Sequence, residues 1–258
     1  MVFSLRIDLE SDKGIREGVP KILALLKKYN IKASFYVAMG GESNILELLR
    51  YQKKLPGKRK ISVFSRGEML RMVFFPRDFV LGNKKIFQKI LDEGHELGIH
   101  GWKHREWTRG LEKIDVRKVI RKAVEKYTKL FGKKPQSFCA PAFRTNNEVV
   151  RILSSQGIKV ISDFEGDSTK KVDGLINVPI TLRGEGNTPI IEYLVGEGYL
   201  DKEILDKVTS AIKRKKFSSL YIHGLFECRK KIGLLENLFK WLEKNKIKTK
   251  KIMDVVDL

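Results

Sequence analysis

The chain has 258 residues, of which 42% are hydrophobic, a share that suits one folded domain and excludes a disordered chain. No apolar run reaches the roughly 18–20 residues of a membrane span, and Asp8 follows the start too soon for a secretion signal, so we expect a cytoplasmic protein. The two cysteines, Cys139 and Cys228, exclude a disulfide scaffold and a four-thiolate zinc site, although they leave a single bridge open.

The chain is strongly basic, with 52 Lys and Arg residues against 31 Asp and Glu residues and a formal net charge of +21. A positive field of this size attracts nucleic acid, anionic lipid headgroups or phosphorylated substrates. The charged residues, 32% of the chain, also include many of both signs, which is typical of a heat-adapted surface. The net charge alone does not distinguish an anionic partner from heat adaptation.

Short β-rich runs alternate with longer helical ones along the chain, which predicts an α/β domain with largely parallel strands. The predicted strands are Phe3–Leu9, Ala33–Val37, Glu96–His100, Ser137–Cys139, Val160–Ser162, Ile176–Val178 and Ser219–His223. The predicted helices are Arg16–Tyr29, Asn44–Tyr51, Lys84–Asp92, Asp115–Phe131, Asn147–Gln156, Lys202–Lys215 and Ile232–Asn245. This pattern predicts a distorted (β/α)7 barrel, and without internal repeats or a Gly, Ser or Pro-rich linker we expect one domain over residues 1–258.

An insertion, residues 51–90, interrupts the alternation after the second strand. Its basic residues, which outnumber Glu68 and Asp78, are Lys53, Lys54, Lys58, Arg59, Lys60, Arg66, Arg71, Arg77, Lys84, Lys85 and Lys89. They are interleaved with Met69, Leu70, Met72, Val73, Phe74, Phe75, Phe79 and Val80. This composition indicates a membrane-surface element or a lid over an amphipathic ligand, or else an ordinary loop whose helix packs on the barrel.

Polar residues stand where several predicted strands end. They are Asp8, Glu10, His100, Asp163 and His223. In β/α barrels the carboxyl ends of the strands carry the active site, because loops from that rim converge above a packed core. These five positions therefore predict a site at one end of the barrel.

Two residue pairs at this rim suggest metal chemistry. His100 and His104 are four residues apart, so a helical turn or tight loop could aim both imidazoles at one metal ion, although solvated helix faces show the same spacing by chance. Asp8 and Glu10 are two residues apart and point to the same side of a continuing strand. One carboxylate could ligate a dication while the other accepts a proton, or both could simply be solvated.

At these residues the chain resembles the polysaccharide deacetylases, metal-dependent amidohydrolases that act on N-acylated sugars. The resemblance covers most of the chain and rests on five motifs, Arg6-Ile7-Asp8-Leu9-Glu10, His100-Gly101-Trp102-Lys103-His104, Ala140-Pro141-Ala142-Phe143-Arg144, Ser162-Asp163-Phe164 and Tyr221-Ile222-His223. Within the family the chain looks closest to the deformylases that act on 4-deoxy-4-formamidoarabinose carried on undecaprenyl phosphate. Segments such as Arg16-Glu17-Gly18-Val19-Pro20 and the basic insertion look like their counterparts.

The resemblance implies a role for each matching residue. Asp8 matches the catalytic base, His223 the general acid, and His100 and His104 two metal ligands, while Glu10 stands where the family usually has a third ligand Asp. Arg144 and Asp163 match groups that orient and neutralise the base and the acid, although a plain salt bridge between them is the alternative. Arg16 is implied in substrate binding. We expect one divalent metal ion, zinc by default, with nickel, cobalt, manganese or iron suiting the same donors.

The expected function is metal-dependent hydrolysis of the formyl or acetyl group of an amino sugar, carried on a polyprenyl phosphate and reached by peripheral contact with a membrane. One alternative is a family member with impaired catalysis, of which Glu10 would be the first sign. The other is a nucleic-acid-binding protein, suggested by the clusters at residues 213–216 and 246–251, although no zinc-finger spacing or nucleotide-binding motif accompanies them. The sequence leaves the oligomeric state open.

Overall fold

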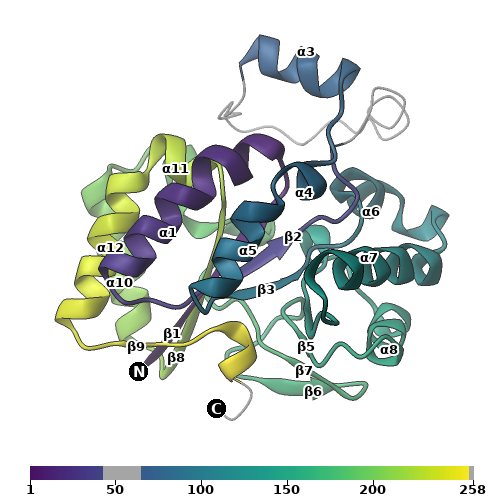
Figure 1. Cartoon of the computed structure of the whole chain (residues 1–258). Helices are drawn as coiled ribbons and strands as arrows, with labels where there is room; N and C mark the ends of the chain where they lie inside the picture. Colours follow the sequence, from purple (N-terminus) through teal and green to yellow (C-terminus); the bar gives the residue numbers. More distant parts are fainter. Residues whose placement is uncertain (43–64, 256–258) are drawn as a thin grey trace.

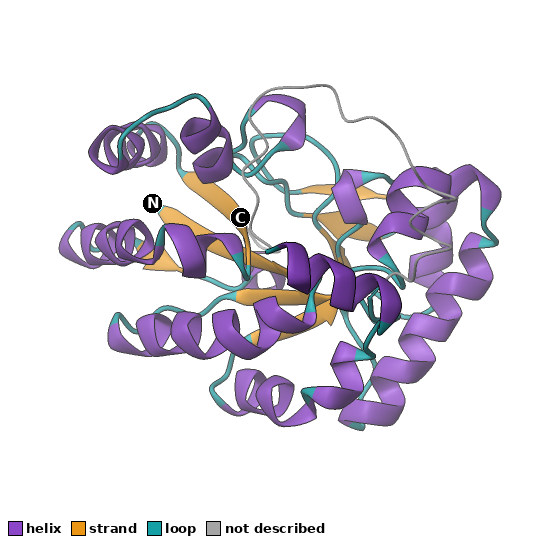
Figure 2. Ribbon diagram, turned by 90° about the horizontal axis from the view of Figure 1, so that it is seen from above, coloured by secondary structure: helices purple, strands orange, loops and turns teal. Residues whose placement is uncertain are grey.

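The computed structural model describes residues 1–42 and 65–255, which form a curled, mostly parallel sheet wrapped by helices (Figures 1 and 2). The strands are β1 (Val2–Leu9), β2 (Ser34–Val37), β3 (Glu96–Ile99), β4 (Ser137–Phe138), β5 (Val160–Ile161), β6 (Lys170–Val172), β7 (Leu175–Asn177), β8 (Phe217–His223) and β9 (Lys248–Thr249). Their order is β6-β7-β5-β4-β3-β2-β1-β8, with β9 on β1 and only β6 and β7 antiparallel.

A single bridge closes this sheet into a barrel. The segment after β7 pairs in parallel with β8 at Leu182 and Leu220, and the Leu182 N–H donates to the Ser219 carbonyl oxygen at 3.0 Å. All seven predicted strands are present, so the prediction of a distorted (β/α)7 barrel is confirmed. The sequence did not predict β6 and β9, because these short strands carry exposed lysines and lack the buried apolar run that marks the other strands.

Six of the predicted helices cover the barrel. They are α1 (Val19–Lys28), α5 (Lys84–Asp92), α7 (Val116–Phe131), α8 (Asn147–Ser155), α10 (Asp201–Lys213) and α12 (Ile232–Lys244). The helix predicted at Asn44–Tyr51 lies outside the described residues. The predicted helix Arg16–Tyr29 starts inside η1 (Gly14–Gly18), a turn of π-helix before α1. The helices that were not predicted include α3 (Arg66–Phe74), α4 (Phe79–Gly82), α6 (His104–Gly110), α9 (Ile190–Gly196) and α11 (Phe226–Lys230).

Apolar and polar side chains alternate along β1, so the apolar ones face the core under the helices and the polar ones face the barrel interior. The buried apolar residues of β1 belong to the core cluster under the helices and are Phe3, Leu5, Ile7 and Leu9. The residues between them, Ser4, Arg6 and Asp8, are equally buried but point to the opposite face, as the period of two requires. Because β1 lies between β2 and β8 in mid-sheet, its polar face leads straight to the rim at Asp8.

The insertion after β2 divides into a projecting part and a packed part. Figure 1 shows α3 above the start of α1 and near α4, at the end of the barrel where the strands finish. On and after α3, Leu70, Phe74 and Phe75 expose 59%, 60% and 73% of their surface. Phe79 on α4 is completely buried instead, and residues 84–90 belong to the covering helix α5. The described helices include none long and apolar enough to cross a membrane.

Candidate active site

The parallel register brings the predicted base and acid to neighbouring strands. Asp8 of β1 pairs with His223 of β8, at the carboxyl end of both strands. Glu10 follows β1 directly, and its Oε1 lies 3.9 Å from His223 Nε2. Asp8 Oδ2 lies 3.9 Å from His100 Nε2. The structure therefore gathers Asp8, Glu10, His100 and His223 at one rim.

Glu10, His100 and His104 form a compact group of donor atoms. Glu10 Oε1 lies 3.1 Å from His100 Nε2 and 3.0 Å from His104 Nε2. One ligand atom from each residue lies within 4.8 Å of the others, and these three residues form the one such His, Cys, Asp or Glu group found in the described part of the chain. Burial opposes a charge on Glu10, but the neighbouring histidines hold its pKa well below the usual range, so it is a carboxylate.

The backbone after β3 explains how both imidazoles reach the same point. His100 directly follows β3, and Gly101 then turns the chain with a φ of +67°. His104 is the first residue of α6. A Cβ at Gly101 would also approach the Pro141 ring within 3.1 Å, so glycine suits this turn on both counts.

The donor set fits a divalent metal ion. His100 Nδ1 lies 2.9 Å from the Cys139 carbonyl oxygen, which can only accept, so Nδ1 carries the proton and Nε2 offers its lone pair to the site. Two imidazole nitrogens and one carboxylate oxygen are ligands that zinc and its neighbours accept, with room left for water and substrate. The residues present thus match the predicted ligands, although their role stays a prediction.

Arg6 is the partner of Asp8. Its Nε and Nη2 donate to the two Asp8 carboxylate oxygens, both at 2.8 Å, and its Nη1 donates to the Ser162 carbonyl oxygen at 2.8 Å. The guanidinium lies 4.8 Å from the Phe143 ring centroid and 5.5 Å from that of Tyr221. Burial lowers the pKa of Arg6, but Asp8 raises it above its usual range, so the guanidinium stays charged beside this carboxylate.

His223 has carboxylates on two sides. Its Nδ1 lies 2.5 Å from Glu192 Oε1 on α9, and its backbone N–H donates to Glu227 Oε2 at 3.1 Å. Burial lowers the pKa of His223, yet Glu192, Glu10 and Glu227 together raise it well above the usual range. Burial in turn raises the pKa of Glu227, which is completely enclosed. The Glu192 carboxylate at Nδ1 therefore favours the protonated imidazole and leaves Nε2 toward Glu10.

The structure separates Arg144 and Asp163, so the alternative of a salt bridge between them is wrong. Arg144 is exposed, and its side chain donates to the Thr108 carbonyl oxygen. It follows Ala142 and Phe143, which take positive φ values of 52° and 56°. The expected neutralisation of Asp8 therefore comes from Arg6 rather than from Arg144.

Asp163 is buried beside the Arg6 and Asp8 pair. Its Oδ1 accepts from the Ala140 N–H at 2.7 Å, while its Oδ2 has no hydrogen-bond partner among the described residues. Burial raises the pKa of Asp163 to about 7, against the lowering effects of Arg6 and the Ala140 N–H. Asp163 was also a candidate partner for the general acid His223, but the carboxylate that lies at Nδ1 of His223 is that of Glu192.

Arg16 lies outside this group. It is 59% exposed on η1, and its Nη1 lies 3.7 Å from Asp12 Oδ2. Its predicted role in substrate binding stays a prediction.

Three residues of the site were not predicted, namely Arg6, Glu192 and Glu227. Arg6 carried a usable signal, since a charge inside an apolar strand needs a buried partner and Asp8 is on the same face. Glu192 and Glu227 carried none, because each lies on a short helix whose place depends on distant contacts.

Two protein families match the sequence of this chain. The polysaccharide deacetylase family matches residues 6–161, more than half of the chain. The chain belongs to this family. Glycosyl hydrolase family 57 also matches, over residues 106–256. The predicted resemblance and the predicted class, a hydrolase that acts on amide C–N bonds in carbohydrates, are confirmed for this polysaccharide deacetylase.

Its relatives and structural neighbours are distant in sequence. A Shewanella sediminis protein described as "Probable 4-deoxy-4-formamido-L-arabinose-phosphoundecaprenol deformylase" is 25% identical over 266 residues, which cover 98% of this chain and 85% of the relative. A peptidoglycan deacetylase of Helicobacter pylori is 28% identical over 167 residues, 60% of this chain and 44% of the relative. The crystal structure of "putative polysaccharide deacetylase from Mycobacterium smegmatis" has a TM-score of 0.67 at 14% identity, covers 99% of this chain and 88% of the other, and shows the same fold.

Proposed function

We propose that this polysaccharide deacetylase uses one divalent metal ion to hydrolyse the formyl or acetyl group of an amino sugar carried on a polyprenyl phosphate. The observation that carries the proposal is the cluster of Glu10, His100 and His104 within reach of both Asp8 and His223. The similarity to the Shewanella sediminis relative, which extends over 98% of this chain, supports the lipid-phosphate-linked substrate.

The reaction is N-acyl sugar plus water giving a carboxylic acid and the free sugar amine. Glu10, His100 and His104 would hold a divalent ion, which would supply Lewis-acid polarisation of the amide carbonyl. Asp8, fixed by the Arg6 fork, accepts a proton from the attacking water. Water oxygen bonds to the carbonyl carbon, and the C–N bond then breaks.

His223 completes the reaction as the general acid. The departing amine is a poor leaving group unless it gains a proton, and Nε2 of His223 points into the site to provide it. Glu192 holds Nδ1 at 2.5 Å and so fixes the ring with Nε2 toward the substrate. Zinc is our first choice of ion, with nickel, cobalt, manganese and iron as candidates for the same donors.

Metal content and hydrolysis of N-formyl and N-acetyl amino sugars test the proposal together. We expect one equivalent of zinc per chain, loss of that zinc in His100→Ala with His104→Ala, and loss of activity with it. Asp8→Asn should keep the zinc but lose at least roughly 100-fold in kcat, because an amide cannot accept the water proton. Arg121→Gln, an exposed change on α7, is the control.

Two outcomes would contradict the proposal. A chain that stays metal-free after incubation with each candidate ion would remove the metal site. Full metal loading without hydrolysis of any N-acyl sugar would indicate an impaired family member, in which Glu10 in place of Asp is the first residue to revert. Steep salt-dependent binding of duplex DNA by an inactive chain would favour the nucleic-acid alternative.

We also propose that the insertion meets the membrane surface from which such a substrate is presented. Leu70, Phe74 and Phe75 form an exposed apolar group on and after α3. Phe79 was expected in this group, but it is buried in the core and is excluded from it. The basic residues of the insertion at positions 53–60 lie outside the described residues.

A further inference from the structure

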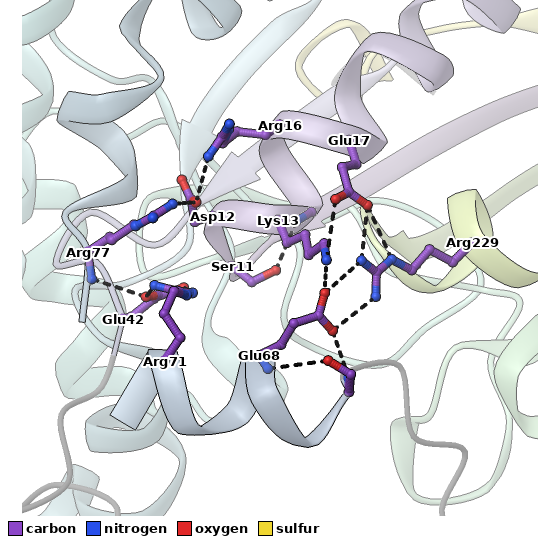
Figure 3. A network of polar contacts seen from close by, with 12 residues as sticks. Ser11, Asp12, Lys13, Arg16, Glu17, Glu42, Glu68, Arg71, Arg77 and Arg229 are labelled. Carbon is purple, nitrogen blue, oxygen red and sulfur yellow. Dashed lines mark hydrogen bonds and ion pairs between the residues drawn. The ribbon is translucent and has the colours of Figure 1, made fainter. Parts of the chain in front are cut away.

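A cavity of about 480 Å³ opens between η1, α3 and the segment that follows α3. It begins at Asp12, two residues after Glu10 in the chain. Figure 3 shows the network of ion pairs around it, which joins η1 to α3 and to Arg229 of α11. Gly67 on α3 leaves the wall open, since a Cβ there would meet nothing within 4 Å.

Most of the cations around the cavity are occupied by carboxylates. Arg71 donates from Nη1 and Nη2 to Glu42 at 2.8 and 2.7 Å, and from Nη1 to the Phe75 carbonyl oxygen. Arg229 donates to Glu17 and Glu68, and Lys13 pairs with Glu68. These ion pairs hold α3 against η1 and α11, and the N–H donors of the three cations are directed at these oxygen acceptors.

Arg16 and Arg77 are different, because both guanidinium groups approach the same carboxylate oxygen, Oδ2 of Asp12. Arg77 Nη1 lies 2.9 Å from Asp12 Oδ2, and Arg16 Nη1 lies 3.7 Å from the same atom. The other oxygen of Asp12 accepts from Asn83 Nδ2 at 2.9 Å, so the carboxylate is fully engaged. Two guanidinium charges against one carboxylate leave an excess of one positive charge at this wall.

The two arginines also keep free donors. A guanidinium has five N–H groups, yet within the described residues Arg77 makes one side-chain hydrogen bond and Arg16 makes none. Their side chains are 49% and 59% exposed, and both line the cavity. A phosphate offers several oxygens in the geometry that paired guanidinium groups recognise, and such charge-assisted bonds are the strong ones.

We propose that this cavity binds the phosphate of a phosphate-linked sugar, with Arg16 and Arg77 as the phosphate-recognising residues. The inference rests on the proposed function, because the sugar's N-acyl group must reach the Glu10, His100 and His104 cluster at the same time. A phosphate seated here anchors the substrate on the η1 side of the rim. The enzyme then prefers phosphate-linked over free N-acyl amino sugars.

Kinetics with three substrates test the proposal. The probes are a free N-formyl amino sugar, its sugar phosphate monoester, and a short-chain prenyl phosphodiester of the same sugar. We expect the ratio of kcat/KM for either phosphate compound to that for the free sugar to fall about tenfold in Arg16→Gln and further in Arg16→Gln with Arg77→Gln, mainly through KM. Arg121→Gln, an equally exposed arginine on α7, should leave the ratio unchanged.

The monoester and the phosphodiester distinguish a soluble sugar phosphate from a lipid carrier. A wild-type ratio near one for both, or equal losses on all three substrates in Arg16→Gln, would overturn the proposal. Calorimetric binding of the phosphate monoester separates this failure from failure of the proposed function. If no substrate is hydrolysed, binding that weakens about tenfold in Arg16→Gln still supports the phosphate site, and binding that is absent or unchanged rejects it.

Discussion

At the residue scale, Asp8 and His223 lie side by side on neighbouring strands, but their partners carry opposite charges. Arg6 supplies a cation to the carboxylate that must accept a proton, and Glu192 supplies an anion to the imidazole that must donate one. Each partner therefore favours the charged form that its neighbour needs before the reaction starts.

Replacing Glu192 tests the second of these pairs. Burial lowers the pKa of His223, whereas Glu192 is the largest of the influences that raise it. A general acid works only while protonated, so activity falls as the pH rises through its pKa. In Glu192→Gln the alkaline limb of the kcat profile should move to lower pH, and kcat at pH 8 should fall roughly 10–100-fold.

Glu236→Gln is the matched control, since Glu236 pairs with Lys28 on an exposed face away from the rim. Glu192→Asp should recover part of the lost kcat if the carboxylate is what matters. An alkaline limb that stays in place in Glu192→Gln would separate Glu192 from the general acid.

Asp163 predicts a pH dependence of stability. Its pKa is about 7 in the fold and near 3.8 unfolded, because burial disfavours the charged form. The folded state thus binds the extra proton, and this stabilisation, on the order of 2–4 kcal/mol, is present at low pH and lost as the pH rises from about 4 through 7.

Asp163→Asn removes the titrating group while keeping an oxygen for the Ala140 N–H. The free energy of unfolding of the wild type, measured by urea titration, should fall relative to this variant between pH 5 and pH 8. Parallel pH curves for the two proteins would show that Asp163 is ionised throughout.

How much of the site could be predicted depends on whether a residue lies at a strand end. Asp8, Glu10, His100 and His223 follow or end apolar strands, so topology alone brings them together. Glu192 could not be found this way, because α9 is placed by the Leu182 to Leu220 bridge and by a Tyr221 hydroxyl that donates to the Asn187 carbonyl oxygen. These contacts join segments more than 30 residues apart.

At the element scale, η1 packs against the loop after β8 with no space for a side chain. A Cβ on Gly18 would lie 1.8 Å from the Gly224 carbonyl oxygen. Backbone cannot yield as a flexible side chain does, so Gly18→Ala should destabilise the protein by roughly 1–3 kcal/mol. Because Gly224 follows His223, the same change should also lower kcat.

Gly67→Ala is the control, since Gly67 lies inside α3 with open space around its Cα. Alanine is the better helix former, so this variant should be neutral or more stable by about 0.5–1 kcal/mol. Thermal unfolding of both variants measures the difference. Equal melting temperatures for Gly18→Ala and wild type would mean that η1 shifts freely.

Elements with a long repeat could be predicted, and short ones could not. The buried residues of α1 follow helical spacing at Val19, Ile22, Leu23 and Leu26, a pattern that is readable without coordinates. In α9 and α11, with seven and five residues, one or two turns give too few positions for such a pattern. The sequence did not predict α3 for another reason, since Leu70 and Phe74 on this helix are exposed and do not mark a face that packs on the core.

At the scale of the whole molecule, net charge and the apolar group of the insertion predict attachment to anionic membranes. The chain carries a net charge of +21, and each basic residue near an anionic surface contributes on the order of 1 kcal/mol. We expect the protein to float with anionic liposomes and not with neutral ones. Changing Leu70, Phe74 and Phe75 to Ser should abolish flotation at physiological salt.

Leu200→Ser is the control for this experiment, because Leu200 is 71% exposed but precedes α10, outside the insertion. Neutralising Lys53, Lys54, Lys58, Arg59 and Lys60 tests the charged part of the insertion separately. Equal flotation of all these proteins, or none at low salt, would leave α3 as an ordinary surface helix.

The pairing of β1 with β8 joins segments that leave the ribosome far apart in time. Val2 pairs with Phe217, about 215 residues later, an interval of roughly 10–40 s at usual rates of synthesis. Until then β1 has β2 on one side and an open edge on the other, and an open strand edge is a template for other chains. The nascent chain therefore passes through a stage that already contains Asp8 and Glu10 but lacks His223. Both the pairing of the open edge of β1 and the completion of the active site depend on the late synthesis of β8.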